Sequence, residues 1–121
     1  MQLVQAILYV DDVEGMRDFY VDLFDLRVIL EEPGWIRLDT GGAVLALHAI
    51  RRPDGASPPA APPAPRTDSA IKLCFRVDDV DRERARLAAA GVVMRETHRY
   101  DAVTFCDGID PEGNVFQLTT Y

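Results

Sequence analysis

Two stretches of the chain repeat one pattern of apolar and polar residues. Residues 6–13 read AILYVDDV and residues 73–80 read LCFRVDDV, so the same four letters follow an apolar run twice. Each apolar run predicts a strand, because short apolar runs with β-branched and aromatic residues favour an extended backbone. Apolar residues then recur at helical spacing over residues 13–24 and, less regularly, over residues 80–90. The repeat therefore predicts a strand followed by a helix in each half.

Acidic residues and a glycine predict where these helices begin and end. Asp11 with Glu14 fits a capping box in which Asp replaces the usual Ser or Thr. Asp78 and Asp79 offer the same capping chemistry to the second helix. Gly91 predicts the end of that helix, because glycine adopts a positive φ at little cost.

Three short strands are predicted after each helix, separated by turn residues such as Pro33-Gly34 and Gly41-Gly42. They cover residues 27–32, 35–40 and 43–50 in the first half and residues 92–98, 102–107 and 114–120 in the second. Each half then has the order β-α-β-β-β. The predicted fold class is α+β, with two tandem modules of this kind.

A proline-rich segment separates the two halves. Six of the eight prolines fall between residues 53 and 65. Because proline is excluded from central strands and favours extended conformations, we interpret residues 51–69 as a linker. A cover over a pocket is the alternative role for this segment. Residues 1–50 and 70–121 are the two modules, and since a module of about 50 residues is marginal alone, we expect one domain over residues 1–121.

Composition and charge narrow the class of protein. Hydrophobic residues make up 48% and charged residues 27% of the chain, as in globular domains. No run of about 18 apolar residues exists, so no membrane span is expected. The net charge of −7 argues against nucleic acids and anionic membranes as partners, since both require clustered Lys and Arg. The N-terminal segment lacks the features of a signal peptide, so a cytoplasmic location is expected.

The two cysteines, Cys74 and Cys106, are too few for a zinc cluster. In a reducing compartment a disulfide between them is not expected. Unpaired cysteine usually packs as a small hydrophobic residue, so both are expected to be buried.

The repeat, the stretch FYVDLFDL at residues 19–26 and the closing DPEGNVFQL at residues 110–118 together resemble the vicinal oxygen chelate (VOC) superfamily. That superfamily includes glyoxalase I, extradiol dioxygenases, fosfomycin-resistance enzymes and bleomycin-resistance proteins. The resemblance implies that the modules form a curled mixed sheet around a cavity and that the chain is a homodimer. In metal-dependent members, the first and last strands of each half supply four ligands, usually His, Glu or Gln. The metal then acts as a Lewis acid on substrate oxygens.

The four positions that the resemblance implies carry unusual residues here, namely Gln5, Ala46, Lys72 and Gln117. A divalent ion requires anionic or strongly basic neutral donors, whereas these positions offer two amides, a methyl and an ammonium. His48, two residues beyond Ala46 and on the same sheet face, adds one good donor. We therefore expect no cofactor. A divalent metal held by an unusual set that includes His48 is the alternative.

Aromatic residues bear on which ligand the cavity would accept. Tyr9 shares its alternation with Gln5 and is expected on the same face. Trp35 follows a turn and is expected at a rim or a subunit contact. Phe116 alternates with Gln117 and is expected beneath the helix, and His98 at the sheet surface.

These observations predict a small-molecule binding protein of the glyoxalase/bleomycin-resistance type. The predicted ligand-binding residues are Gln5, Tyr9, His48, Lys72 and Gln117. The acidic surface favours a cationic ligand, and the aromatic residues favour an aromatic one. Two enzymes remain as alternatives. One is a metal-dependent lyase, isomerase or dioxygenase with a non-standard ligand set. The other is a metal-free enzyme that uses Lys72 or His48 for proton transfer.

Overall fold

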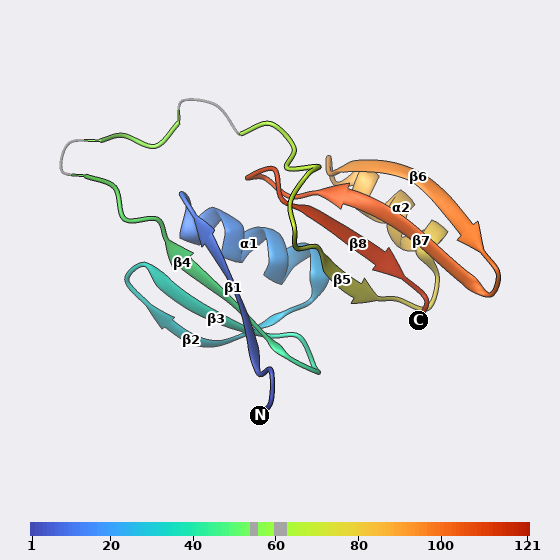
Figure 1. The fold of residues 1–121 in the computed structure, drawn as a ribbon, viewed down its shortest axis with the longest axis horizontal. Coiled ribbons are helices and arrows are strands. Elements are labelled where there is room, and N and C mark those ends of the chain that lie inside the picture. The colour runs from blue at the N-terminus through green and yellow to red at the C-terminus, as the bar shows by residue number, and fades with distance from the viewer. Residues whose placement is uncertain (54–55, 60–62) are drawn as a thin grey trace. The chain divides into compact units, whose positions relative to one another are not determined.

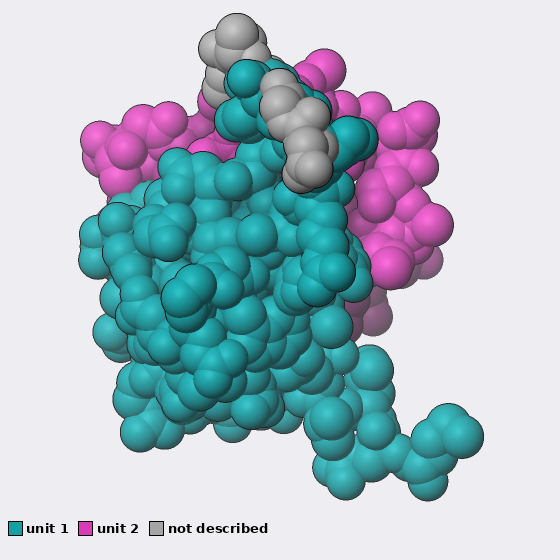
Figure 2. Space-filling model, turned by 90° about the vertical axis from the view of Figure 1, so that its left-hand side faces the viewer, with its two compact units in different colours: residues 1–61 teal, residues 62–121 magenta. Residues whose placement is uncertain are grey.

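The structure, a computed structural model of the chain, describes residues 1–53, 56–59 and 63–121. The chain divides into two compact units, residues 1–61 and residues 62–121 (Figure 2). Each unit holds one four-stranded mixed sheet and one helix in the order β-α-β-β-β (Figure 1). This arrangement confirms the predicted α+β class with two tandem modules.

The first unit has its strands in the spatial order β1-β4-β3-β2. Its elements are β1 (Gln5–Val10), α1 (Val13–Phe24), β2 (Arg27–Glu32), β3 (Trp35–Asp39) and β4 (Val44–Ala49). β1 pairs with β4 in parallel, while β2, β3 and β4 are antiparallel to their neighbours. The turn residues Pro33-Gly34 and Gly41-Gly42 fall between strands, which is why the sequence predicted the strand bounds within one residue.

Helix α1 covers one face of the first sheet. Its buried side chains Val13, Met16 and Tyr20 pack over the middle strands, which contribute the buried residues Ile36, Leu38, Leu45 and Leu47. Burying each large apolar side chain stabilises the fold by roughly 1.5–3 kcal/mol. The packing of α1 therefore fixes the orientation of β3 and β4. Side chains on the sheet face away from the helix are oriented by the same packing.

Asp12, and not Asp11, caps helix α1. Its Oδ1 accepts a hydrogen bond of 2.9 Å from the backbone N–H of Gly15. The predicted capping box at Asp11 and Glu14 is wrong by one residue, because the buried Val13 is already the first helical residue. Asp11 instead forms an ion pair with Arg52.

The second unit repeats this topology with the order β5-β8-β7-β6, and β5 pairs with β8 in parallel. Its elements are β5 (Leu73–Arg76), α2 (Val80–Ala89), β6 (Val93–Tyr100), β7 (Val103–Ile109) and β8 (Val115–Thr119). Asp79 caps α2 as predicted, accepting a hydrogen bond of 2.9 Å from Arg82 N. Gly91 ends the helix with a φ of 90°, also as predicted. Among the described residues, no helix is long and apolar enough to cross a membrane.

The core of the second unit corrects one prediction about cysteine. Phe116, Cys106 and Leu87 are buried, so the predictions for Phe116 and Cys106 are confirmed. Cys74, however, is exposed. It pairs in register with Gln117 rather than with Phe116, and therefore points to the face opposite α2.

The closing turn of the second unit, Asp110–Asn114, is fixed by its own side chains. Oδ1 of Asp110 accepts from the backbone N–H groups of Glu112 at 3.0 Å and Asn114 at 2.8 Å. Gly113 lies at a φ of 82°, and its carbonyl accepts from Arg66 N at 2.8 Å. The end of the predicted linker is thus attached to this turn, while its residues 54–55 and 60–62 lie outside the described residues.

Candidate functional site

The predicted site residues lie on the sheet face opposite the helix in each unit, which we call the open face. In the first unit, alternation along β1 places Gln5 and Tyr9 there, and alternation along β4 places Ala46 and His48 there. Tyr9 is directly opposite His48 in the parallel pair β1–β4. The fold therefore brings the predicted residues Tyr9 and His48 together.

Tyr9, His48 and Trp35 form a row across three neighbouring strands, which we call the aromatic row. The ring centroids of Tyr9 and His48 are 5.2 Å apart, and those of His48 and Trp35 are 5.3 Å apart. Both distances lie within the range of favourable ring contacts. Tyr9 is 62% exposed, so one end of the row is open to solvent.

The part played by Trp35 in the row was not predicted, since a rim or a subunit contact was expected for it. The β3–β4 hairpin turns at Gly41-Gly42, and counting outwards from that turn sets residue 35 opposite residue 48. This count was the sequence signal for the Trp35–His48 contact.

Polar atoms of the aromatic row remain available to a ligand. Nδ1 of His48 is 2.9 Å from the carbonyl oxygen of Ala49, which can only accept, so the proton lies on Nδ1. In the neutral ring, Nε2 is then an acceptor. Within the part of the chain that the structure describes, neither Nε2 of His48, the indole N–H of Trp35 nor the hydroxyl of Tyr9 has a hydrogen-bond partner. The row can stack on a flat molecule and also hydrogen-bond to it.

Gln5 lies on the same open face but is engaged by an arginine. Its Oε1 accepts a hydrogen bond of 3.0 Å from Nε of Arg37. Arg37 is opposite Ala46 in the β3–β4 pair, and Ala46 is fully buried with no donor atom. A guanidinium group therefore already occupies the surroundings of the Gln5 oxygen.

In the second unit, Lys72 and Gln117 meet at a carboxylate that the sequence analysis missed. Oδ2 of Asp107 is 2.9 Å from Nζ of Lys72, and Oδ1 accepts a hydrogen bond of 3.0 Å from Nε2 of Gln117. We call Lys72, Asp107 and Gln117 the Asp107 cluster. The turn centred on Glu112 places residue 107 opposite residue 117, so counting along this hairpin was the signal that could have found it.

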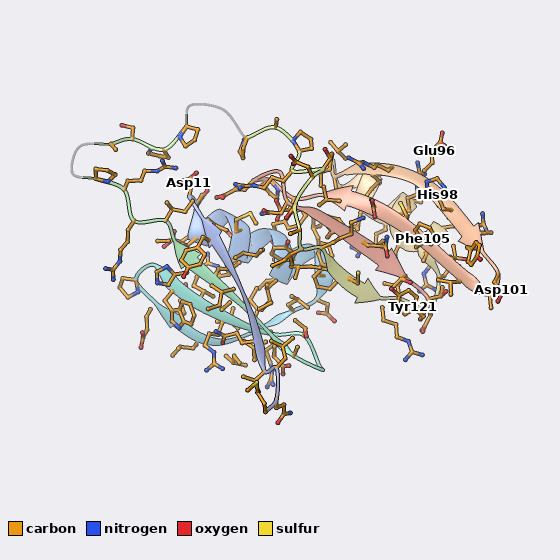
Figure 3. The ribbon with its side chains drawn as sticks, in the orientation of Figure 1. Asp11, Glu96, His98, Asp101, Phe105 and Tyr121 are labelled. Atoms are coloured by element: carbon orange, nitrogen blue, oxygen red, sulfur yellow. The ribbon has the colours of Figure 1, made fainter. Side chains whose placement is uncertain are left out.

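A second aromatic contact lies further along the same open face. His98 of β6 and Phe105 of β7 stack with centroids 5.5 Å apart and an interplanar angle of 30° (Figure 3). Phe105 shares its alternation with Asp107, and His98 is exposed at the sheet surface, as predicted. The open face of the second unit thus combines a polar cluster with a stacked pair.

The chain matches the family model "Glyoxalase/Bleomycin resistance protein/Dioxygenase superfamily" over residues 2–118. The chain belongs to this superfamily. The repeat and the closing DPEGNVFQL motif had predicted this family, and the prediction is confirmed. No curated protein matches the chain.

Solved structures of the glyoxalase type resemble the chain over nearly its full length. Lactoylglutathione lyase from Agrobacterium tumefaciens is 25% identical, with a TM-score of 0.73 over 98% of this chain and 92% of that one. TnmS3, an antibiotic binding protein from Streptomyces sp. CB03234, is 25% identical, with a TM-score of 0.69 over 98% and 93%. TioX from Micromonospora sp. ML1 is 21% identical, with a TM-score of 0.74 over 98% of each chain, and supports the fold alone.

The solved structures that are similar to this chain thus include both an enzyme and an antibiotic binding protein. Because these two proteins share the fold, the fold alone does not tell an enzyme from a binding protein. Over residues 1–53, 56–59 and 63–121, no group of three or more His, Cys, Asp or Glu side chains is placed to hold a metal ion. Among the described residues, the aromatic row and the Asp107 cluster are candidate features for ligand binding.

Proposed function

We propose that this chain binds a small planar organic molecule on the aromatic row and does so without a metal ion. The observation that carries the proposal is the contact of three rings from three strands, Tyr9, His48 and Trp35. Rings held by neighbouring strands present a preformed surface, so little conformational entropy is lost when a flat ligand stacks on them.

The charge beside the row supports a ligand that is both aromatic and cationic. Glu32 is opposite Trp35 in the β2–β3 pair, which sets a carboxylate next to the indole. An aromatic face and a nearby carboxylate both attract positive charge. The net charge of −7 adds a long-range attraction for such a compound.

The side chains at the four positions implied by the superfamily support binding without a metal. Gln5 hydrogen-bonds to Arg37, and Ala46 has no donor atom. Lys72 carries an ammonium, and the amide nitrogen of Gln117 faces Asp107. None of the four positions carries a carboxylate, and a cationic group lies at Lys72 and, through Arg37, beside Gln5, so these side chains do not suit a divalent ion.

The similar structure of TnmS3, an antibiotic binding protein, is consistent with a binding role for this chain. The similar structure of lactoylglutathione lyase is consistent with the alternative, an enzyme. The donor set described above is the reason to favour the binding protein, since a metal-dependent lyase would need a different one.

Trp35 provides a direct test, because it is the only tryptophan in the chain. We would titrate the protein with a library of planar aromatic cations and neutral aromatic compounds and follow the fluorescence of Trp35. A ligand stacked on the aromatic row should quench or shift this emission. Tyr9→Ala should then weaken binding roughly two- to tenfold, since one aromatic contact contributes about 0.5–1.5 kcal/mol.

Tyr100→Ala is the matched control, because Tyr100 is also an exposed tyrosine, 79% exposed at the end of β6, and is not part of the aromatic row. It should leave the affinity unchanged. The proposal is wrong if no compound changes the emission of Trp35, or if Tyr9→Ala and Tyr100→Ala weaken binding equally.

We further propose that the chain works as a cytoplasmic homodimer. The family resemblance supports the dimer. Exposed apolar side chains also support it, because Leu3, just before β1, is 91% exposed and Ile7, within β1, is 44% exposed. Sedimentation velocity and cell fractionation test the two parts of this proposal. A monomer at all concentrations would overturn the first, and a membrane or extracellular fraction would overturn the second.

A further inference from the structure

The Asp107 cluster determines which way the Gln117 amide faces. Oδ1 of Asp107 accepts the hydrogen bond of 3.0 Å from Nε2 of Gln117. An ionised carboxylate has no hydrogen to donate, so the nitrogen end of the amide must face Asp107 and the oxygen end must face away. The orientation of Gln117 is therefore a consequence of the charge on Asp107.

Lys72 holds the other oxygen of the same carboxylate. Its Nζ is 2.9 Å from Oδ2, while the Asp107 side chain is only 18% exposed. A carboxylate withdrawn from water in this way requires a counter-ion, and Lys72 supplies it. The guanidinium of Arg95 is more distant, at 3.9 Å from Oδ2. Asp107 thus fixes two side chains, one before β5 and one on β8.

Once fixed, these two side chains offer one acceptor and one donor to the open face. Oε1 of Gln117 is approached only by Sγ of Cys74, at 3.9 Å, among the residues that the structure describes. A thiol at that distance is a weak donor, so Oε1 can accept from a ligand. Lys72 is 40% exposed and has N–H groups beyond the one directed at Asp107.

We propose that Asp107 is a specificity-determining residue of a binding position on the open face of the second unit. The position takes a neutral group in which an N–H lies beside a C=O, as in an amide, lactam or imide. The N–H of such a group donates to Oε1 of Gln117 and its C=O accepts from Nζ of Lys72. This position is built from residues of the second unit, whereas the aromatic row is built from residues of the first.

A carboxylate is the group that this position rejects. Both of its oxygens are acceptors, so one of them would face Oε1 of Gln117 without a hydrogen. Its attraction to Lys72 is weakened, because that ammonium is already neutralised by Asp107. The positive charge of Arg95 would attract a carboxylate and so opposes this preference. Its side chain is 42% exposed, so solvent screens this attraction.

The test compares 2-pyridone, which has an N–H beside a C=O, with benzoate, which has two acceptor oxygens. Both are titrated into ¹⁵N-labelled protein, and the side-chain amide signals of Gln117 are followed. The wild-type chain should bind 2-pyridone about fivefold more tightly than benzoate at this position. The Gln117 signals report this position, and Trp35 fluorescence reports the aromatic row, so the two proposals fail independently.

Asp107→Asn removes the cause of the preference while keeping the size of the side chain. An amide both donates and accepts, so Gln117 becomes able to turn its nitrogen outwards, and the ratio of the two affinities should fall to near unity. Asp101→Asn is the charge-matched control. It lies at the β6–β7 turn with a φ of 52°, which Asn tolerates, and it should keep the wild-type ratio.

The ratio of affinities is the decisive readout, because general damage to the unit would lower both affinities together. Lys72→Met is a second variant that leaves the Asp107–Gln117 hydrogen bond in place. It should keep the wild-type Gln117 signals and lose most of the affinity for 2-pyridone. Equal binding of the two probes by the wild-type chain, or an unchanged ratio in Asp107→Asn, would overturn the proposal. If Asp107→Asn does not fold, the wild-type ratio and Lys72→Met decide.

Discussion

A Cβ atom on Gly113 would lie 2.8 Å from the carbonyl oxygen of Ala64. It would also lie 2.9 Å from the carbonyl oxygen of Pro63, closer than real Cβ contacts are found. The end of the proline-rich segment therefore lies directly on the closing turn of the second unit, where Arg66 N donates to the Gly113 carbonyl. Glycine is required at this position by the neighbouring backbone as well as by its φ of 82°.

Three glycine substitutions separate these two requirements. Gly41 has a φ of 83° with nothing within 4 Å of an added Cβ, and Gly42 has neither a positive φ nor a neighbour. Gly41→Ala should lower the free energy of unfolding by about 1–2 kcal/mol, the strain of a left-handed residue, while Gly42→Ala should change it by less than about 0.5 kcal/mol. Gly113→Ala should cost about 1–3 kcal/mol more than Gly41→Ala, because the backbone of residues 63–64 must move.

Urea denaturation of the three variants measures these differences. Equal losses for Gly113→Ala and Gly41→Ala would show that the contact with residues 63–64 contributes nothing to stability. In that case the φ alone would account for glycine at the closing turn.

The two cysteines should differ in reactivity. Cys74 is exposed, whereas Cys106 is buried and burial raises the pKa of its thiol. Since the thiolate is the nucleophile, Cys106 should resist thiol reagents in the folded protein. Ellman's reagent should therefore label Cys74 alone under native conditions and both cysteines in denaturant. Cys74→Ser should abolish the native signal, and rapid native labelling of Cys74→Ser would contradict the assignment.

Glu83 should make the stability depend on pH in the acidic range. Hydrogen bonds from Arg86, at 2.7 Å, and from Arg82 lower the pKa of Glu83 below its ordinary value of 4.5. The unfolded chain then binds a proton more readily than the folded one. The contribution of Glu83 is present above pH 4.5 and is lost as the pH falls through the lower folded value.

Glu83→Gln measures this contribution, and Glu14→Gln is its control. Both acids lie in the first turn of a helix, so both interact with the helix dipole. Glu83→Gln should lower the free energy of unfolding near neutral pH by less than about 1 kcal/mol, and the difference should vanish in acid. A pH-independent difference, or an equal change in Glu14→Gln, would argue against the ion pairs as its source.

Metal content is a further property to test. Because the donor set contains Lys72 and the engaged amide of Gln117, purified protein should contain substoichiometric metal and should bind Ni(II), Zn(II) and Mn(II) weakly. Elemental analysis and calorimetric titration measure both quantities. Stoichiometric metal whose affinity is lost in His48→Ala would favour the metal-dependent alternative instead.

The sequence predicted the fold well because turn residues and alternation are local signals. Pro33-Gly34 and Gly41-Gly42 delimit the strands of the first unit, and Gly91 ends the second helix, as expected. The helix cap at Asp11 was placed one residue early, because two adjacent aspartates offer the same chemistry. Only the packing of Val13 decides which of them comes before the helix.

The candidate site was less predictable because its contacts join residues on different strands. Asp107 escaped notice although it lies opposite Gln117, since a carboxylate on a middle strand has no signal in a single-strand pattern. Cys74 was expected to be buried on residue type alone, and the face of β5 on which it lies decides otherwise. Trp35 and His48 meet for a similar reason, through the register of a hairpin.

In both modules the first strand has one neighbour, and that neighbour is the last strand (Figure 1). β1 therefore cannot form its sheet hydrogen bonds until β4 has been synthesised, and β5 cannot form its own until β8 has been synthesised. On the ribosome, the N-terminal sheet can close once Ala49 has emerged, whereas the C-terminal sheet stays incomplete until Thr119 has emerged. A nascent chain that stops before Val115 would therefore leave β5 unpaired in its sheet and expose it to chaperones and proteases.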